Sequence, residues 1–128
     1  PKPVSIRGAS EVLAKGWTLT GGGVLGEVTL GGLVGAKAPL STDVGDGDSW
    51  TNAAASGWGG DRFEVWESAG KAVVLVATVW DSESDAREFE SALPRDRLAV
   101  RRAGARVGIV AGAAGAKLEP LLALLVRR

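Results

Sequence analysis

The chain has 128 residues, 45% of them hydrophobic, and its 15 basic side chains balance 15 acidic ones. We therefore expect a single globular domain over residues 1–128, with no membrane span and no overall charge that would favour nucleic acid. The absence of histidine and cysteine excludes serine–histidine and cysteine–histidine catalysis and ordinary zinc or copper sites, so no cofactor is expected.

The N-terminal part is rich in glycine and predicts short elements. Ser10 is the expected N-cap of a short helix that Gly16 ends, and Trp17–Thr20 is expected to form a short strand. The run Gly21–Gly26 matches the G-x-G-x-x-G dinucleotide fingerprint by its letters, but no apolar strand leads to the acids that follow about twenty residues later. We interpret the run as a glycine-rich connector.

Residues 36–49 are expected to form a long acidic surface loop. Its three aspartates lie among glycines, as in calcium-binding loops, but the EF-hand spacing fails because position twelve counted from the first of them is Ala54. They are the weak candidates for a metal site, and we prefer a solvated loop: Asp43, Asp46 and Asp48.

The second half predicts an antiparallel sheet of about four strands. Phe63–Trp66 and Val73–Trp80 flank the turn Ser68–Lys71, which is typical of a β-hairpin. A helix capped by Ser82 follows, then a second hairpin that turns at Ala103–Gly104, then a helix with a leucine stripe. We therefore expect an α+β fold in which two hairpins form the sheet and the helices pack on one of its faces.

The stretch Ser56–Trp66 (SGWGGDRFEVW) resembles a ligand-binding site more than any other part of the sequence. In the architectural interpretation, the glycines make a tight corner and Trp58 anchors it in the core. Asp61 then binds backbone amides or pairs with Arg62. As a site, its backbone N–H groups and Arg62 would bind an anion. Glu27 is either a buried base or an ion-pair partner of Arg62. We favour the architectural interpretation, with Glu27, Asp61 and Arg62 in one polar cluster.

A second candidate surface is the arginine-rich hairpin, which has Asp96 as its single acid. With tryptophans in neighbouring strands it would offer cations for phosphates and rings for base stacking. The alternative is a solvated hairpin whose arginines pair with nearby acids. We prefer this alternative because the net charge is zero and only 5% of residues are aromatic. The basic side chains are Arg95, Arg97, Arg101, Arg102 and Arg106.

Three motifs, Leu25–Glu27, Gly57–Phe63 and Thr78–Phe89, occur in this order. They resemble a bacterial family of uncharacterised domains whose members read roughly LGE … GWGGDR(Y/F) … TVWDS..DA.EF. The resemblance covers most of the chain, which departs from it in the acidic loop and at Val28, where relatives tend to have an aromatic residue. In longer relatives the domain follows a segment similar to a zinc metallopeptidase. The resemblance implies a secreted or cell-envelope setting rather than an activity, and a cytoplasmic setting stays open.

The chain starts at Pro1 without an initiator methionine, as a mature form or an excised domain would. Asn52 is its sole asparagine and it has no glutamine, cysteine or methionine, which is typical of thermophilic proteins. We expect a non-enzymatic recognition or scaffold domain that binds another protein or another domain of its parent chain. The alternatives are a small carboxylate-dependent hydrolase using Glu27 and Asp61, and an anion or nucleic-acid binder using the Arg95–Arg106 hairpin.

Overall fold

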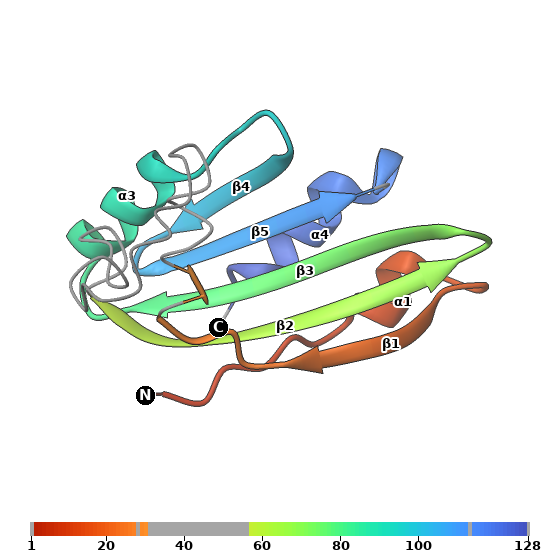
Figure 1. Cartoon of the computed structure of the whole chain (residues 1–128), viewed down its shortest axis with the longest axis horizontal. Coiled ribbons are helices and arrows are strands. Elements are labelled where there is room, and N and C mark those ends of the chain that lie inside the picture. The colour runs from red at the N-terminus through yellow and green to blue at the C-terminus, as the bar shows by residue number, and fades with distance from the viewer. Residues whose placement is uncertain (1, 28, 31–56, 113, 128) are drawn as a thin grey trace, which may run out of the picture.

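An antiparallel sheet of five strands, ordered β1-β2-β3-β5-β4, forms the centre of the protein (Figure 1). The computed structural model describes residues 2–27, 29–30, 57–112 and 114–127. Together with the helices, this sheet confirms the α+β fold, with one strand more than expected because β1 adds to the edge of the first hairpin. The strands are β1 (Thr18–Gly23), β2 (Trp58–Ser68), β3 (Lys71–Trp80), β4 (Leu98–Ala103) and β5 (Arg106–Gly112).

Helices cover both faces of the sheet, so the expectation of a single covered face is wrong. Leu75 and Val110 pack with α1 (Ala9–Leu13) and α4 (Leu118–Leu125), which lie behind the sheet in Figure 1. The neighbouring residues Val76 and Ile109 pack with Phe89 of α3 (Glu83–Ala92) on the opposite face. Because successive strand residues point to opposite faces, the doubly apolar β3 needs a covering layer on each side.

The hairpin between β2 and β3 confirms the first predicted turn. Ala69 and Gly70 have φ angles of 48° and 80°. Two successive residues in the left-handed region form the tight turn whose twist matches that of the flanking strands. The second hairpin also forms, and Gly104 at its turn has φ of 59°.

The glycine-rich stretch before Asp61 is part of β2 rather than a corner, which corrects that expectation. Trp58 pairs with Trp80 and Gly60 with Val79, so a bulge at Gly59 carries the strand through. The N-terminal segment lies against this bulge, and the Lys2 amide donates to the Gly59 carbonyl at 2.5 Å. Glycines fit here because they leave room for a second backbone.

One of the two predicted N-caps is confirmed and the other is wrong. Ser82 caps α3 as expected, since its Oγ accepts from the Asp85 amide at 3.0 Å. Ser10 does not cap α1, because it lies inside the helix, whose N-cap is Gly8 with φ of 89°. The acidic loop at 36–49, with Asp43, Asp46 and Asp48, lies outside the described residues.

Candidate functional site

The carboxylate of Asp61 is the most highly bonded polar group of the three motifs. Its side chain is 2% exposed. One oxygen accepts from the Leu25 amide at 2.6 Å, and the other accepts from the Gly26 amide and from Trp58 Nε1, each at 2.9 Å. Asp61 therefore ties the first motif to the second and holds the residues that follow β1.

The third motif joins the same end of the sheet. Trp80 Nε1 donates to Thr78 Oγ1 at 2.8 Å, and the Thr78 hydroxyl donates to the Val107 carbonyl at 2.8 Å. The Asp81 amide donates to the Gly57 carbonyl at 2.8 Å. The side chains of Trp58, Asp61, Thr78 and Trp80 are thus bonded to one another or to backbone, which favours the architectural interpretation of the stretch.

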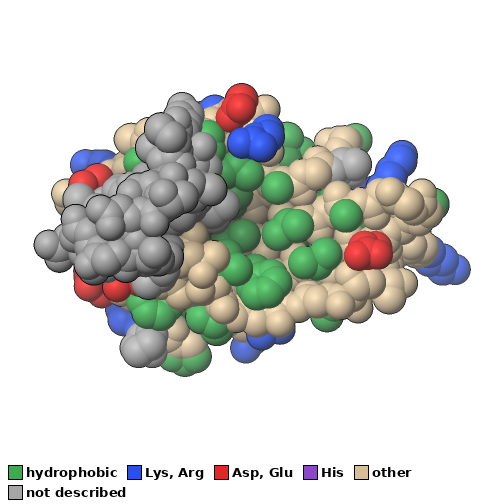
Figure 2. All heavy atoms as spheres, viewed as in Figure 1, with side chains coloured by type: hydrophobic (Ala, Val, Ile, Leu, Met, Phe, Trp, Pro, Cys, Tyr) green, Lys and Arg blue, Asp and Glu red, His purple; other side chains and the backbone are tan. Residues whose placement is uncertain are grey.

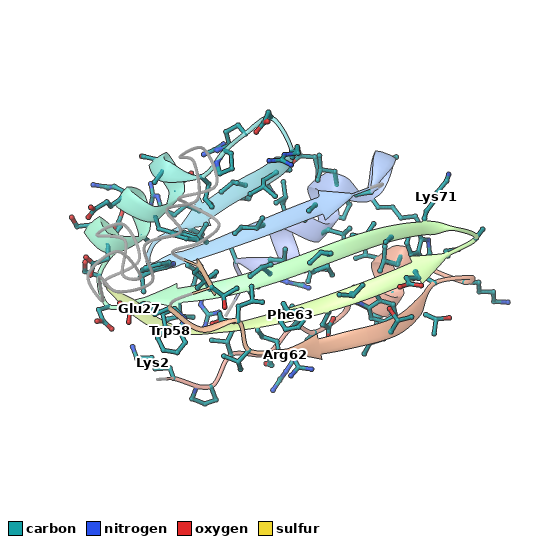
Figure 3. The ribbon with its side chains drawn as sticks, viewed as in Figure 1. Lys2, Glu27, Trp58, Arg62, Phe63 and Lys71 are labelled. Carbon is teal, nitrogen blue, oxygen red and sulfur yellow. The ribbon has the colours of Figure 1, made fainter. Side chains whose placement is uncertain are left out.

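Arg62 and Glu27 do not join this network. Arg62 is the neighbour of Asp61 on β2 and so points to the other face, where its guanidinium lies beside Gly22. In Figure 3, Glu27 lies at the Trp58 end of β2 and Arg62 points away from it. Within the described part of the chain, no ion pair links Arg62 to Asp61 or Glu27.

The structure places a buried acid that the sequence analysis did not single out. Glu64 is 8% exposed, and its carboxylate accepts from Trp66 Nε1 at 3.1 Å. Both lie on the face covered by α1 and α4. The alternation of β2 could have suggested this pair, because Glu64 and Trp66 are two residues apart and share a face.

Four of the five arginines in the second hairpin region are paired with acids. Arg102 Nε lies 3.0 Å from Glu90 and its Nη1 lies 3.3 Å from Glu83, so β4 is tied to α3. Arg101 pairs with Glu119 of α4, and the looser pairs, at 3.8 Å, are Arg95 with Glu90 and Arg97 with Asp96. Such pairing reduces the positive surface that nucleic acid would need.

Arg106 behaves differently from the other four. Its guanidinium donates to the backbone carbonyl of Arg127 at 3.3 Å, and it has no carboxylate partner among the described residues. It lines two neighbouring pockets of about 560 and 530 Å³. Neither pocket is lined by Glu27 or Asp61, so neither supports a two-carboxylate active site.

The free edge of β1 is a second feature that the sequence analysis did not assign to a site. β1 pairs with β2 and, within the described ranges, with no other strand. Leu19 is 46% exposed, and Val24, just after the strand, is 63% exposed. Figure 2 shows hydrophobic side chains along the middle of the sheet face that faces the viewer. Among the described residues, the β1 edge is therefore open, and Leu19 and Val24 expose apolar surface beside it.

Two kinds of feature are absent from the described residues. No three acids there lie close enough together to form a metal site. None of the helices in these ranges combines the length and the apolar character that a membrane crossing requires.

A family model described as a domain of unknown function (DUF8575) matches residues 17–108. The chain belongs to this family. The match starts just before β1 and ends within β5, so it includes the three motifs and the β1 edge but neither α1 nor α4. A family of unknown function agrees with the uncharacterised domain that the motifs implied. No curated protein and no solved structure matches the chain.

Proposed function

We propose that the chain is a non-enzymatic recognition domain that binds an extended segment of a partner protein along the open edge of β1. The observation that carries the proposal is that this edge pairs with no further strand in the part of the chain that the structure describes, has no charged residue and contains three successive glycines, Gly21–Gly23. An edge strand presents unpaired backbone N–H and C=O groups, which an added strand satisfies.

The two edges of the sheet differ in a way that supports β1 as the binding edge. β4, at the other edge, carries Arg101 and Arg102, which are tied to helices on opposite faces. Charges on an edge strand discourage further strand pairing. From Gly16 to Gly26 there is neither a charged residue nor a proline, so the β1 edge lacks these two common protections.

The glycines of β1 also expose apolar side chains of the next strand. Gly21 and Gly23 face Val65 and Phe63 across the pair, and both of these side chains are only half-buried. Glycine within a strand often marks a place where another backbone approaches closely. We expect the bound segment to carry apolar residues at alternate positions, which would lean over the glycines onto Phe63 and Val65.

The test begins with selection of phage-displayed random peptides on the immobilised 128-residue chain. Selected peptides are then synthesised, titrated into the chain, and mapped by backbone amide NMR shifts. We expect extended, apolar-alternating peptides whose shifts centre on Thr18–Gly23. Leu19→Lys should weaken their binding about tenfold, because it adds a charge at the edge that pairs with the peptide.

Ser91→Lys is the matched control, because it adds the same charge at an exposed position of α3. It should change the affinity by less than about twofold. The proposal fails if no strand-forming peptide is selected, if the shifts centre elsewhere, or if both lysine variants weaken binding equally.

The setting of the domain is also part of the proposal. We propose a thermophilic bacterial source and an exported parent protein, on the basis of the amino-acid usage and of the three motifs. The partner segment would then belong to another exported protein or to another domain of the parent chain. Sequencing the full open reading frame tests this directly, since a leader peptide is expected upstream and its absence would contradict export.

A further inference from the structure

Three arginines from distant parts of the sequence converge on one pocket of about 530 Å³. Arg7 comes from the N-terminal segment, Arg106 from the start of β5, and Arg127 from the residues after α4. The Ser5 hydroxyl also lines the pocket. The bond from Arg106 to the Arg127 carbonyl fixes one side of the Arg106 guanidinium and leaves its other donors for a ligand.

The charges in this pocket are unbalanced. Against the three guanidinium groups the lining contains a single carboxylate, that of Glu11. Among the described residues, none of the three arginines forms an ion pair. This contrasts with the paired arginines of β4 and α3, although all belong to a chain with no net charge. A concave site lined by unpaired cations concentrates anions.

We propose that this pocket binds the phosphate group of a small phosphorylated molecule. Guanidinium groups bind phosphate oxygens through paired N–H donors in a geometry that suits a tetrahedral oxyanion. Pockets for small ligands typically have volumes of about 300–1,000 Å³. The pocket therefore has room for an organic group beside the phosphate, and the apolar side chains of Val4 and Leu124 line it.

Arg106 also lines a second, neighbouring pocket. This second pocket has a volume of about 560 Å³ and shares Arg106 with the first pocket. Its other charged lining residues, Lys2 and Asp81, carry opposite charges that cancel. The larger excess of positive charge thus lies on the side of Arg7 and Arg127. We expect Arg106 to be the central contact, because it is half-buried and orients toward both pockets, whereas Arg7 and Arg127 are exposed.

The experiment is a calorimetric titration of the full chain at low ionic strength with inorganic phosphate and with phenyl phosphate. We expect saturable binding of phenyl phosphate at least as tight as that of inorganic phosphate. Arg106→Gln should weaken binding about tenfold or more, because it removes a charged donor from the site. Arg7→Gln should weaken it less.

Arg87→Gln is the control, since it removes the same charge from an exposed ion pair on α3. Its affinity for either phosphate should stay within about twofold of the unmodified chain. Thermal unfolding checks that each variant is folded, and a misfolded Arg106→Gln protein is replaced by Arg106→Lys, which keeps the charge but loses the paired donors. The proposal is overturned if neither phosphate binds saturably, or if Arg87→Gln weakens binding as much as Arg106→Gln.

Discussion

Asp61 is a buried acid whose two carboxylate oxygens both accept hydrogen bonds. Three N–H donors converge on its carboxylate, and two of them are backbone amides from residues 36 and 35 positions earlier in the chain. These hydrogen bonds hold the residues that follow β1 against β2 and give partners to a carboxylate that is buried. We therefore regard Asp61 as a structural residue of the β1–β2 edge.

Replacement of Asp61 by alanine tests this role. Asp61→Ala should lower the free energy of unfolding by about 3 kcal/mol, because buried N–H groups lose a charged acceptor. Asp96→Ala, at an acid whose side chain is 70% exposed, should change it by less than about 0.5 kcal/mol. Urea unfolding measures both. An increase in stability for Asp61→Ala would instead indicate an acid kept for activity at the expense of stability.

For single residues, the sequence indicated which chemistry is possible but not which residues contact one another in the fold. The absence of histidine excluded histidine-dependent catalysis. The N-capping role of Ser82 follows from the local sequence pattern at the start of α3. The partners of Asp61 did not follow from any local pattern, because its donors come from a segment about 35 residues away. The convergence of Arg7 with Arg106 could not be predicted for the same reason.

At the scale of elements, the contact between α4 and β5 depends on one glycine. A Cβ atom at Gly108 would lie 2.7 Å from the Cβ of Leu125. Leu125 is buried in the core beneath the sheet. The missing side chain lets the helix approach β5 closely and bury its leucines.

Adding a methyl group at this position should separate the two elements. Gly108→Ala should lower the free energy of unfolding by about 1–3 kcal/mol through overpacking. Gly21→Ala on β1 is the control, because its Cβ would meet Val65 at an ordinary 3.8 Å. Urea unfolding compares the two variants. Equal stability of the two would show that α4 does not depend on Gly108.

Elements with strong local signals could be predicted, and those defined by tertiary context could not. The hairpins and the helix after Trp80 have clear alternation, turn and cap signals. Residues 24–57 separate β1 from β2 in the sequence, and half of β1 consists of glycines, which give no strand signal. The two apolar faces of β3 could have indicated a covering layer on each side, although one covered face was expected. Which helix covers which face depends on tertiary packing that no local pattern shows.

For the whole molecule, an ion-pair network links α3 to β4 and to the residues between them. Arg102 lies at its centre and pairs with Glu83 and Glu90, which also pair with Arg87 and Arg95. Networks of this kind are more effective at high temperature than isolated pairs, because the cost of desolvating charges falls on heating. The network therefore supports the proposed thermophilic source.

Thermal unfolding tests this proposal. We expect an unfolding midpoint above about 75 °C, beyond the range of about 45–65 °C that mesophilic domains usually show. Differential scanning calorimetry of the 128-residue chain gives the value. A midpoint within the mesophilic range would contradict the thermophilic assignment and leave the fold and the two binding proposals unaffected.

The position of β5 between β3 and β4 has a consequence for synthesis on the ribosome. β4 leaves the exit tunnel before β5, yet among the described strands β5 is the one to which it pairs. The nascent chain therefore exposes β3 and β4 as unpaired edges until Arg106–Gly112 emerge, and α4 covers the sheet only afterwards. Because exposed strand edges aggregate readily, we expect the nascent protein to be most prone to aggregation while β5 and α4 are being synthesised.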